Sequence, residues 1–308
     1  MALKSSRRPD PHMAERRGPL SPPAPGQPED VGWDPVAEQW NAWSPVTDAM
    51  FGPATTALLA MLDLKPGEKV LELAAGSGGL TLHLAQAVGP SGQVIATDLG
   101  PKLLQFTEQN ARAAGLSNVV VRVMNGQNAD LPENSTDAVA CRQALMLFPD
   151  PASALRASLR VLRPSGRLGV TVFSTLERNG FLATPIAAVS RWAKPNASAK
   201  GTPESPGPFS LGAPGQLEEM FARTGFIDVK SRLVSSSFRA RTVDEMMRFY
   251  REVLTGLVSD VPEAEKERAW TEIAQSLSKY VRPGSAGAPI ELLVVTGRKP
   301  ARSERPGS

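Results

Sequence analysis

Between residues 69 and 173 the sequence alternates short apolar segments with longer amphipathic ones. The short segments have the length and β-branched content of buried strands, and the longer ones have the periodicity of helices. Strands are expected at 69–74, 93–99, 118–125, 136–144 and 166–174. Buried strands that alternate with helices predict an α/β fold, with a doubly wound, mostly parallel sheet covered on both faces.

Later segments extend this sheet and divide the chain. Two further strands are expected at 227–240 and 290–299, with helices between them, which gives a Rossmann-like sheet of seven strands. Pro, Arg, Ser and Gly dominate the N-terminal residues, so a packed core is not expected there. We predict a disordered tail (1–30), a helical N-terminal cap (31–66), the ligand-binding core (67–174), a lid insertion over the substrate (175–216), the rest of the core with a helical insertion (217–299) and a second disordered tail (300–308).

Composition restricts the class of protein. Hydrophobic residues make up 41% and charged residues 21%, as in ordinary globular proteins, and the net charge is only +3. Many basic residues lie in the two tails rather than on an expected folded face, so we predict no nucleic-acid partner. No apolar run has the length of a membrane span, and no apolar stretch of a secretory signal follows the basic N-terminus. Cys141 is the single cysteine. We therefore expect a cytoplasmic protein.

A glycine-rich turn, Ala74 to Gly79, joins the first strand to a helix. In open α/β sheets the ligand binds beyond the carboxyl ends of the strands, where glycines allow close approach and a helix N-terminus offers N–H donors. A dinucleotide motif would read G-x-G-x-x-G, and a P-loop would end in Gly-Lys-Ser/Thr. This turn reads AAGSGG and fits neither phosphate-binding motif.

Two acidic residues narrow the choice of ligand. Glu72 lies on the first strand, and Asp98 ends the second strand about 20 residues after the turn, where a ribose-binding acid is expected. Carboxylates suit a ligand that combines a ribose with positive charge. S-adenosylmethionine (SAM) carries a ribose, an ammonium and a sulfonium.

Five motifs in order resemble the class I SAM-dependent methyltransferases, over residues 40–229. The similarity is greatest to the branch of ubiquinone/menaquinone-biosynthesis and natural-product methyltransferases. The motifs are VLELAAGSG (70–78), VIATDLGPKLL (94–104), VMNGQNADLPENSTDAVACRQALMLFPDP (123–151), LRVLRPSGRLGVTVF (159–173) and PGPFSLGAPGQLEEMFARTGF (206–226).

The resemblance implies a set of cofactor-binding residues. Glu72 matches the acid of the family's D/E-x-x-x-G-x-G motif and Asp98 matches its ribose acid. Leu99 would pack on the adenine, and Gln143 lies where cofactor and substrate would meet. The turn residues that would hold the methionine moiety are Ala74, Ala75, Gly76, Ser77 and Gly78.

One position departs from the family pattern. Asn125 and Gly126 stand where the family usually has Asp-Ala, whose acid contacts the adenine amino group. An amide oxygen still accepts a hydrogen bond, although without charge. If the register slips by two residues, Gln127 and Asn128 take this place.

Methyl transfer from a sulfonium needs alignment and exclusion of water more than a base. Candidate bases are weak: His83 on the helix after the turn, and Gln143. No Cys or His cluster suggests a metal. The candidate substrate residues are Trp40, Arg142, Phe181, Arg191, Trp192 and Phe209.

Several of these candidates also have plain alternatives. Trp33, Trp40 and Trp43 form either a core-capping cluster or a cover over a small-molecule site. Arg142 either pairs with an acid or, together with Arg178, Arg191 and Lys194 as basic neighbours, holds an anionic group such as the diphosphate of an isoprenoid.

The sequence therefore predicts a SAM-dependent methyltransferase. The acceptor is expected to be a small lipophilic molecule: a secondary metabolite, a quinone-like compound or an isoprenoid. The first alternative keeps the SAM fold and carries out another reaction, such as a cyclisation, with SAM as a structural ligand. An NAD(P)-binding oxidoreductase is disfavoured by the glycine turn. A nucleic-acid methyltransferase is disfavoured because no Asn-Pro-Pro-Tyr motif follows the fourth strand.

Overall fold

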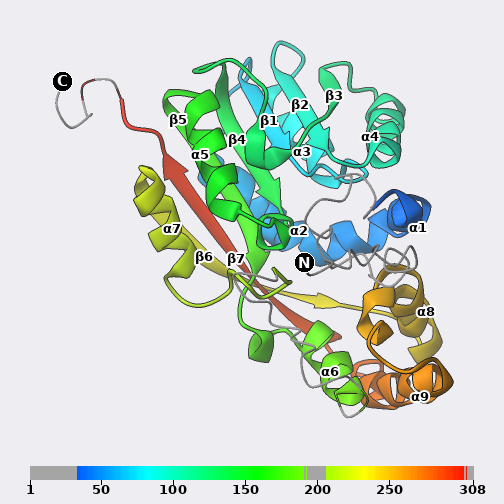
Figure 1. The fold of residues 1–308 in the computed structure, drawn as a ribbon. Helices are drawn as coiled ribbons and strands as arrows, with labels where there is room; N and C mark the ends of the chain where they lie inside the picture. The colour runs from blue at the N-terminus through cyan, green and yellow to red at the C-terminus, as the bar shows by residue number, and fades with distance from the viewer. Residues whose placement is uncertain (1–32, 191, 193–205, 302, 304–308) are drawn as a thin grey trace, which may run out of the picture.

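The computed structural model describes residues 33–190, 192, 206–301 and 303, which form a sheet flanked by helices (Figure 1). The strand order is β3-β2-β1-β4-β5-β7-β6. The strands are β1 (Lys69–Leu73), β2 (Gln93–Asp98), β3 (Val119–Val123), β4 (Thr136–Arg142), β5 (Leu162–Phe173), β6 (Ile227–Phe238) and β7 (Ala288–Arg298).

The first five strands are parallel, and β1 lies between β2 and β4 at the centre of the sheet. Chain order runs outward from β1 toward β3 on one side and from β4 toward β5 on the other. The carboxyl ends of β1 and β4 are therefore the point at which an open α/β sheet forms its ligand crevice. β7 runs antiparallel to both β5 and β6.

Helices cover both faces of the sheet. On one face α2 packs against β5, β6 and β7, and α3 and α4 pack against β1, β2 and β3. On the other face α5 and α7 pack together, against β5, β6 and β7. The helices are α1 (Ala37–Ala42), α2 (Ser44–Leu62), α3 (Gly79–Val88), α4 (Pro101–Ala113), α5 (Pro151–Val161), α6 (Gly180–Val189), α7 (Gln216–Thr224), α8 (Val243–Val253) and α9 (Lys266–Leu277). Asp150 caps α5 by accepting a hydrogen bond from the backbone N–H of Ser153, as its sequence position predicts.

The predicted fold class is confirmed: a doubly wound, mostly parallel sheet of seven strands with flanking helices, α1 and α2 forming a helical segment before β1. The predicted lid insertion over 175–216 stays a prediction, because part of it lies outside the described residues. α8 and α9 lie in the connection between the paired antiparallel strands β6 and β7. Together with α6 they pack near one end of these two strands (Figure 1). The predicted tail at 1–30 and most of the tail at 300–308 lie outside the described residues. So do Arg191 and Lys194 of the lid.

An aromatic cluster joins the lid helix to the helical insertion. The ring of Phe181 on α6 lies 5.4 Å from the ring of Phe238 and 6.0 Å from that of Phe249 on α8. The fully buried Tyr250 donates its hydroxyl hydrogen to the backbone carbonyl of Phe181. Stacked and edge-on rings of this kind fix the relative position of α6 and α8.

Replacement of Tyr250 by Phe tests this junction. The buried carbonyl of Phe181 loses its donor, so we expect the free energy of unfolding to fall by about 1–3 kcal/mol. Urea denaturation measures it. Tyr280→Phe is the matched control, because the half-buried hydroxyl of Tyr280 pairs with Thr184 at 3.0 Å and should cost at most about 1 kcal/mol. Equal losses in the two variants would contradict the assigned role of Tyr250.

Candidate functional site

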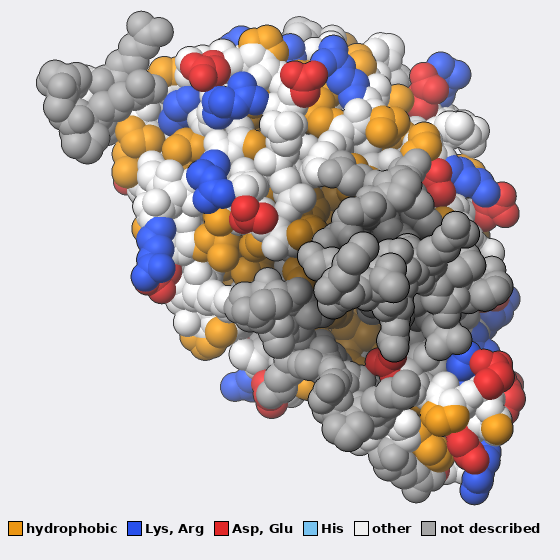
Figure 2. All heavy atoms as spheres, viewed as in Figure 1, with side chains coloured by type: hydrophobic (Ala, Val, Ile, Leu, Met, Phe, Trp, Pro, Cys, Tyr) orange, Lys and Arg blue, Asp and Glu red, His pale blue; other side chains and the backbone are white. Residues whose placement is uncertain are grey.

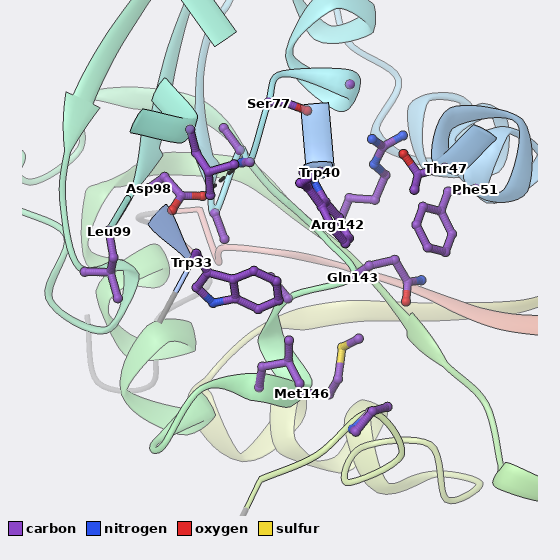
Figure 3. Close-up of a pocket in the computed structure, with 18 of the residues that line it drawn as sticks. Trp33, Trp40, Thr47, Phe51, Ser77, Asp98, Leu99, Arg142, Gln143 and Met146 are labelled. Carbon is purple, nitrogen blue, oxygen red and sulfur yellow. Dashed lines mark hydrogen bonds between the residues drawn. The ribbon is translucent and has the colours of Figure 1, made fainter. Parts of the chain in front are cut away.

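A cavity of about 470 Å³ opens at the carboxyl ends of β1, β2 and β4. Its wall comes from the glycine turn, the ends of β2 and β4, helix α2, the lid and α8. Figure 3 shows Asp98 on one side, Arg142 and Phe51 on the other, and the rings of Trp33 and Trp40 between them. On the face of the molecule seen in Figure 2, basic and acidic side chains of the described residues are interspersed.

The glycine turn has a left-handed backbone that brings its peptide groups to the cavity wall. Gly76 and Gly78 have φ of 59° and 95°, which glycine adopts without strain. A Cβ atom on Gly78 would lie 3.1 Å from Cα of Thr107 on α4, so this glycine is also required by close packing. Thr107 in turn donates its hydroxyl hydrogen to the carbonyl of Gly76 at 2.8 Å. The turn is thus clamped against α4.

Asp98 connects the turn to the end of β2. Its carboxylate accepts hydrogen bonds from the backbone N–H groups of Gly76 and Gly100, each at 2.9 Å. Burial raises the pKa of Asp98 above its ordinary value, and the hydrogen bonds from Gly100 and Gly76 oppose that rise. The carboxylate lines the cavity beside the turn, where a ligand's hydroxyl groups can reach it.

Glu72 lies deeper, at the end of β1. It is 1% exposed and accepts a hydrogen bond from the hydroxyl of Thr81 at 2.6 Å. Burial raises its pKa from 4.5 to about 7, while the bond from Thr81 and the nearby Arg142 lower it. Glu72 is therefore a carboxyl group that changes its charge near neutral pH.

The predicted adenine-side residues also meet at the cavity. Leu99, Asn125, Gly126 and Gln127 all line it, and Oδ1 of Asn125 accepts a hydrogen bond from the backbone N–H of Gln127 at 2.9 Å. A Cβ atom on residue 126 would lie 2.9 Å from the ring of Phe148. This contact explains why the chain carries Gly where the family usually has Ala.

The other end of the cavity is apolar. Phe51 on α2 meets the ring of Phe173 edge-on at 6.2 Å, and both rings are almost fully buried. The remaining apolar side chains at this end include Met50, Met146, Leu147, Phe181, Leu182, Phe249, Val253 and Leu254.

Gln143 stands between the two ends and has a strained backbone. Its φ is 57°, which is unusual for a residue other than glycine. Its side-chain amide donates to Oγ1 of Thr171 at 3.3 Å, and its Oε1 is buried without a hydrogen-bond partner among the described residues. Gln143 thus gives the cavity wall an amide group whose oxygen is unpaired among the described residues.

Some predicted site residues lie elsewhere. His83 is exposed on α3 and Arg178 is exposed beyond β5, and neither lines the cavity, so His83 is not placed to act as a base there. Phe209 lies behind the wall, 5.8 Å from the ring of Phe173, and Trp192 packs on the core outside the lining. Gly78 supports the turn without lining the cavity. Arg191 is outside the described residues.

Sequence reasoning missed the contributions of α2 and α8. Thr47, Asp48 and Phe51 come from α2, and Phe249 and Val253 come from α8. Both helices lie outside the five motifs. An acid that lies three residues before Phe51 on the same helix was the available signal for a polar position facing the cavity.

The comparison with known families agrees with this geometry. A family model described as a methyltransferase domain matches residues 64–223, more than half of the chain. The chain belongs to the methyltransferase domain family. It is 28% identical to nocamycin O-methyltransferase of Saccharothrix syringae over 256 residues, which cover 80% of this chain and 91% of that protein.

Another relative matches over a shorter stretch of the chain. The chain is 38% identical to the ubiquinone/menaquinone biosynthesis C-methyltransferase UbiE of Pasteurella multocida over 112 residues, 36% of this chain and 42% of that protein. Among solved structures, a SAM-dependent methyltransferase of Aquifex aeolicus has a TM-score of 0.51 at 16% identity, covering 85% of this chain and 98% of that one. The [4+2]-cyclase SpnF has a TM-score of 0.56 at 19% identity, covering 91% and 99%. At such identities these structures show the fold alone.

The predicted resemblance is therefore confirmed, and the protein is a SAM-dependent methyltransferase. The described part of the chain contains no helix with the length and apolar character needed to cross a membrane.

The shifted pKa of Glu72 predicts a pH-dependent stability. Because burial raises this pKa from 4.5 to about 7, the folded protein binds a proton that the unfolded chain has lost. The free energy of unfolding should therefore fall as the pH rises from about 4.5 to above 7, by up to about 3 kcal/mol from this group. Glu72→Gln, which cannot ionise, should lack this part of the fall. Urea denaturation between pH 5 and 8 measures it, and a variant that loses stability as steeply as the wild type would contradict the assignment.

Proposed function

We propose that this enzyme transfers a methyl group from SAM to a small lipophilic acceptor held at the apolar end of the cavity. One observation carries the proposal: a single cavity has a polar end, made by the glycine turn and Asp98, and an apolar end, made by Phe51 and Phe173. A nucleoside ligand fits the first end and a lipophilic molecule fits the second.

The residues at the polar end fit SAM. Asp98 offers a carboxylate to the ribose hydroxyls, and the glycine turn exposes backbone groups next to it. Leu99 and Phe148 offer apolar contact to the adenine, and Asn125 and Gln127 offer amide groups to its polar edge. When bound, SAM supplies a methyl group activated by the positive sulfonium.

The protein's own contribution is to align the acceptor and exclude water. No histidine lines the described part of the cavity wall, and two of the carboxyl groups there, Glu72 and Asp98, are buried and hydrogen bonded. An acceptor whose nucleophile is already reactive, such as a phenol or an enol carbon, suits such a site. One relative is named as an O-methyltransferase of nocamycin and another as a C-methyltransferase of quinone biosynthesis, which supports a natural-product or quinone-like acceptor.

The described residues give no support to a diphosphate-bearing acceptor. Arg142 pairs with Asp48 at 2.9 Å, and Arg178 lies away from the cavity. The other two predicted cations, Arg191 and Lys194, lie outside the described residues. We therefore favour an uncharged lipophilic acceptor.

Release of S-adenosylhomocysteine (SAH) tests the proposed reaction. We expect the purified protein to bind SAM in the micromolar range and not NADH by isothermal titration, and to release SAH with members of a panel of phenols, quinols and enols. Phe51→Ala should raise KM for an apolar acceptor about 10-fold or more, since it removes a large apolar contact. SAM binding and conversion of an added substrate without SAH release would instead identify a non-methylating reaction such as a cyclisation.

Asp98→Asn tests the cofactor end. The variant loses the negative charge of a hydrogen-bond acceptor for the ribose hydroxyls, so SAH binding should weaken about 10- to 100-fold. Asp137→Asn is the matched control, because Asp137 also accepts from a backbone N–H, that of Lys69 at 2.8 Å, but at the amino ends of β1 and β4, away from the cavity. We expect titration to give the wild-type affinity for the control. Unchanged affinity in Asp98→Asn would remove Asp98 from the proposed site.

A further inference from the structure

An ion pair lies against the glycine turn, contributed by residues outside the family's motif for that turn. Nη2 of Arg142 lies 2.9 Å from Oδ1 of Asp48, and its Nη1 donates to the hydroxyl of Thr55 at 3.1 Å. Asp48 and Thr55 belong to α2, and Arg142 is the last residue of β4. The pair therefore fastens the N-terminal cap to the centre of the sheet.

The pair is placed at the start of α3. A Cβ atom on Gly79, the first residue of that helix, would collide with both Oδ1 of Asp48 and Nη2 of Arg142. Gly79 ends the turn that is proposed to hold the methionine moiety of SAM. The ion pair thus lies on the turn side of the cavity, and the apolar side chain of Phe51 lies on its other side, with its ring 5.9 Å from the guanidinium of Arg142.

Both partners retain unused hydrogen-bonding capacity. The second carboxylate oxygen of Asp48 has no hydrogen-bond partner among the described residues, and the side chain is 34% exposed although it lines the cavity. Arg142 has five N–H donors, and it uses one on Nη1 to bind Thr55 and one on Nη2 to bind Asp48. A ligand with both an ammonium and a carboxylate complements such a pair.

The charged residues that line the cavity also favour a ligand with an ammonium group at Asp48. Arg142 is the one Lys or Arg among the described residues that line it, whereas three acids do: Asp48, Glu72 and Asp98. Asp98 is engaged by the turn and by the proposed ribose, and Glu72 is almost fully buried. Asp48 is thus the carboxylate left for a cationic group of the ligand.

From this geometry we infer that Asp48 and Arg142 bind the amino-acid end of the cofactor, with the α-ammonium at Asp48 and the α-carboxylate at Arg142. This inference rests on the proposed function. It moves Arg142 from the acceptor, where the sequence placed it, to the cofactor. It also makes α2 part of the cofactor site, so the helical cap and the sheet form that site together.

Binding of two ligands that differ only at this end tests the inference. SAH carries the whole amino acid, and 5′-methylthioadenosine keeps the nucleoside and sulfur but lacks the ammonium and the carboxylate. Isothermal titration of both ligands against Asp48→Asn should show SAH binding weakened about 10- to 100-fold. Binding of 5′-methylthioadenosine should be unchanged, which also shows that the variant is folded.

Two further variants complete the test. Arg142→Lys keeps the charge but loses the planar fork, so it should also weaken SAH selectively. Asp63→Asn is the matched control, because Asp63 is the exposed acid that ends the same helix, α2, and it should bind both ligands like the wild type.

The outcomes separate the inference from the proposed function. A wild-type chain that binds neither SAH nor SAM would overturn the proposed function. Wild-type binding of SAH, with equal losses for both ligands in Asp48→Asn, would overturn the inference alone and assign Asp48 a purely structural role. Unchanged binding of both ligands with a lowered kcat for a hydroxyl acceptor would also overturn it, because Asp48 would then face the acceptor.

Discussion

The carboxylate of Asp98 holds together the part of the molecule on which the site depends. It accepts N–H groups from the turn after β1 and from the turn after β2, so two loops that follow neighbouring strands share one anchor. Thr107 adds a third connection by donating to the carbonyl of Gly76. A backbone with left-handed residues is kept in one conformation because it is held at both its N–H and its carbonyl groups. The hydrogen bonds of the fold itself therefore shape the wall of the proposed cofactor site.

Local sequence patterns predicted the core of this structure well. The central strands β1, β2 and β4 follow directly from the alternation of buried and amphipathic segments, because these strands are covered on both faces. The turn could also be predicted, because Gly76 and Gly78 adopt positive φ angles that favour glycine. In these places local chemistry and global fold demand the same residue.

The parts that could not be predicted depend on contacts between distant segments. Asp48 is the one charged residue of α2, but the local sequence does not indicate its partner, and only the packing of α2 brings it to Arg142, 94 positions away. His83 shows the opposite case: it follows the motif closely in sequence, but the turn of α3 directs it to solvent. Aromatic residues of the lid were ambiguous for a similar reason. Phe181 lines the cavity and Phe209 supports it from behind, a difference that depends on tertiary packing alone.

Because α8 and α9 are inserted between β6 and β7, the two ends of the cavity are built from different parts of the fold. The residues of the proposed nucleoside end come from the parallel strands at the centre, whereas Phe249 and Val253 reach the proposed acceptor end from a helix attached at the edge of the sheet. Trp43 of the cap contacts this helix by donating to Glu252 at 2.6 Å, so the insertion is packed firmly without joining the central strands. Mutations in α8 can therefore reshape the acceptor end while the register of β1 and β4 stays fixed. In evolutionary terms, such a chain can exchange one acceptor for another by altering a peripheral helix, and its methyl donor remains the same throughout.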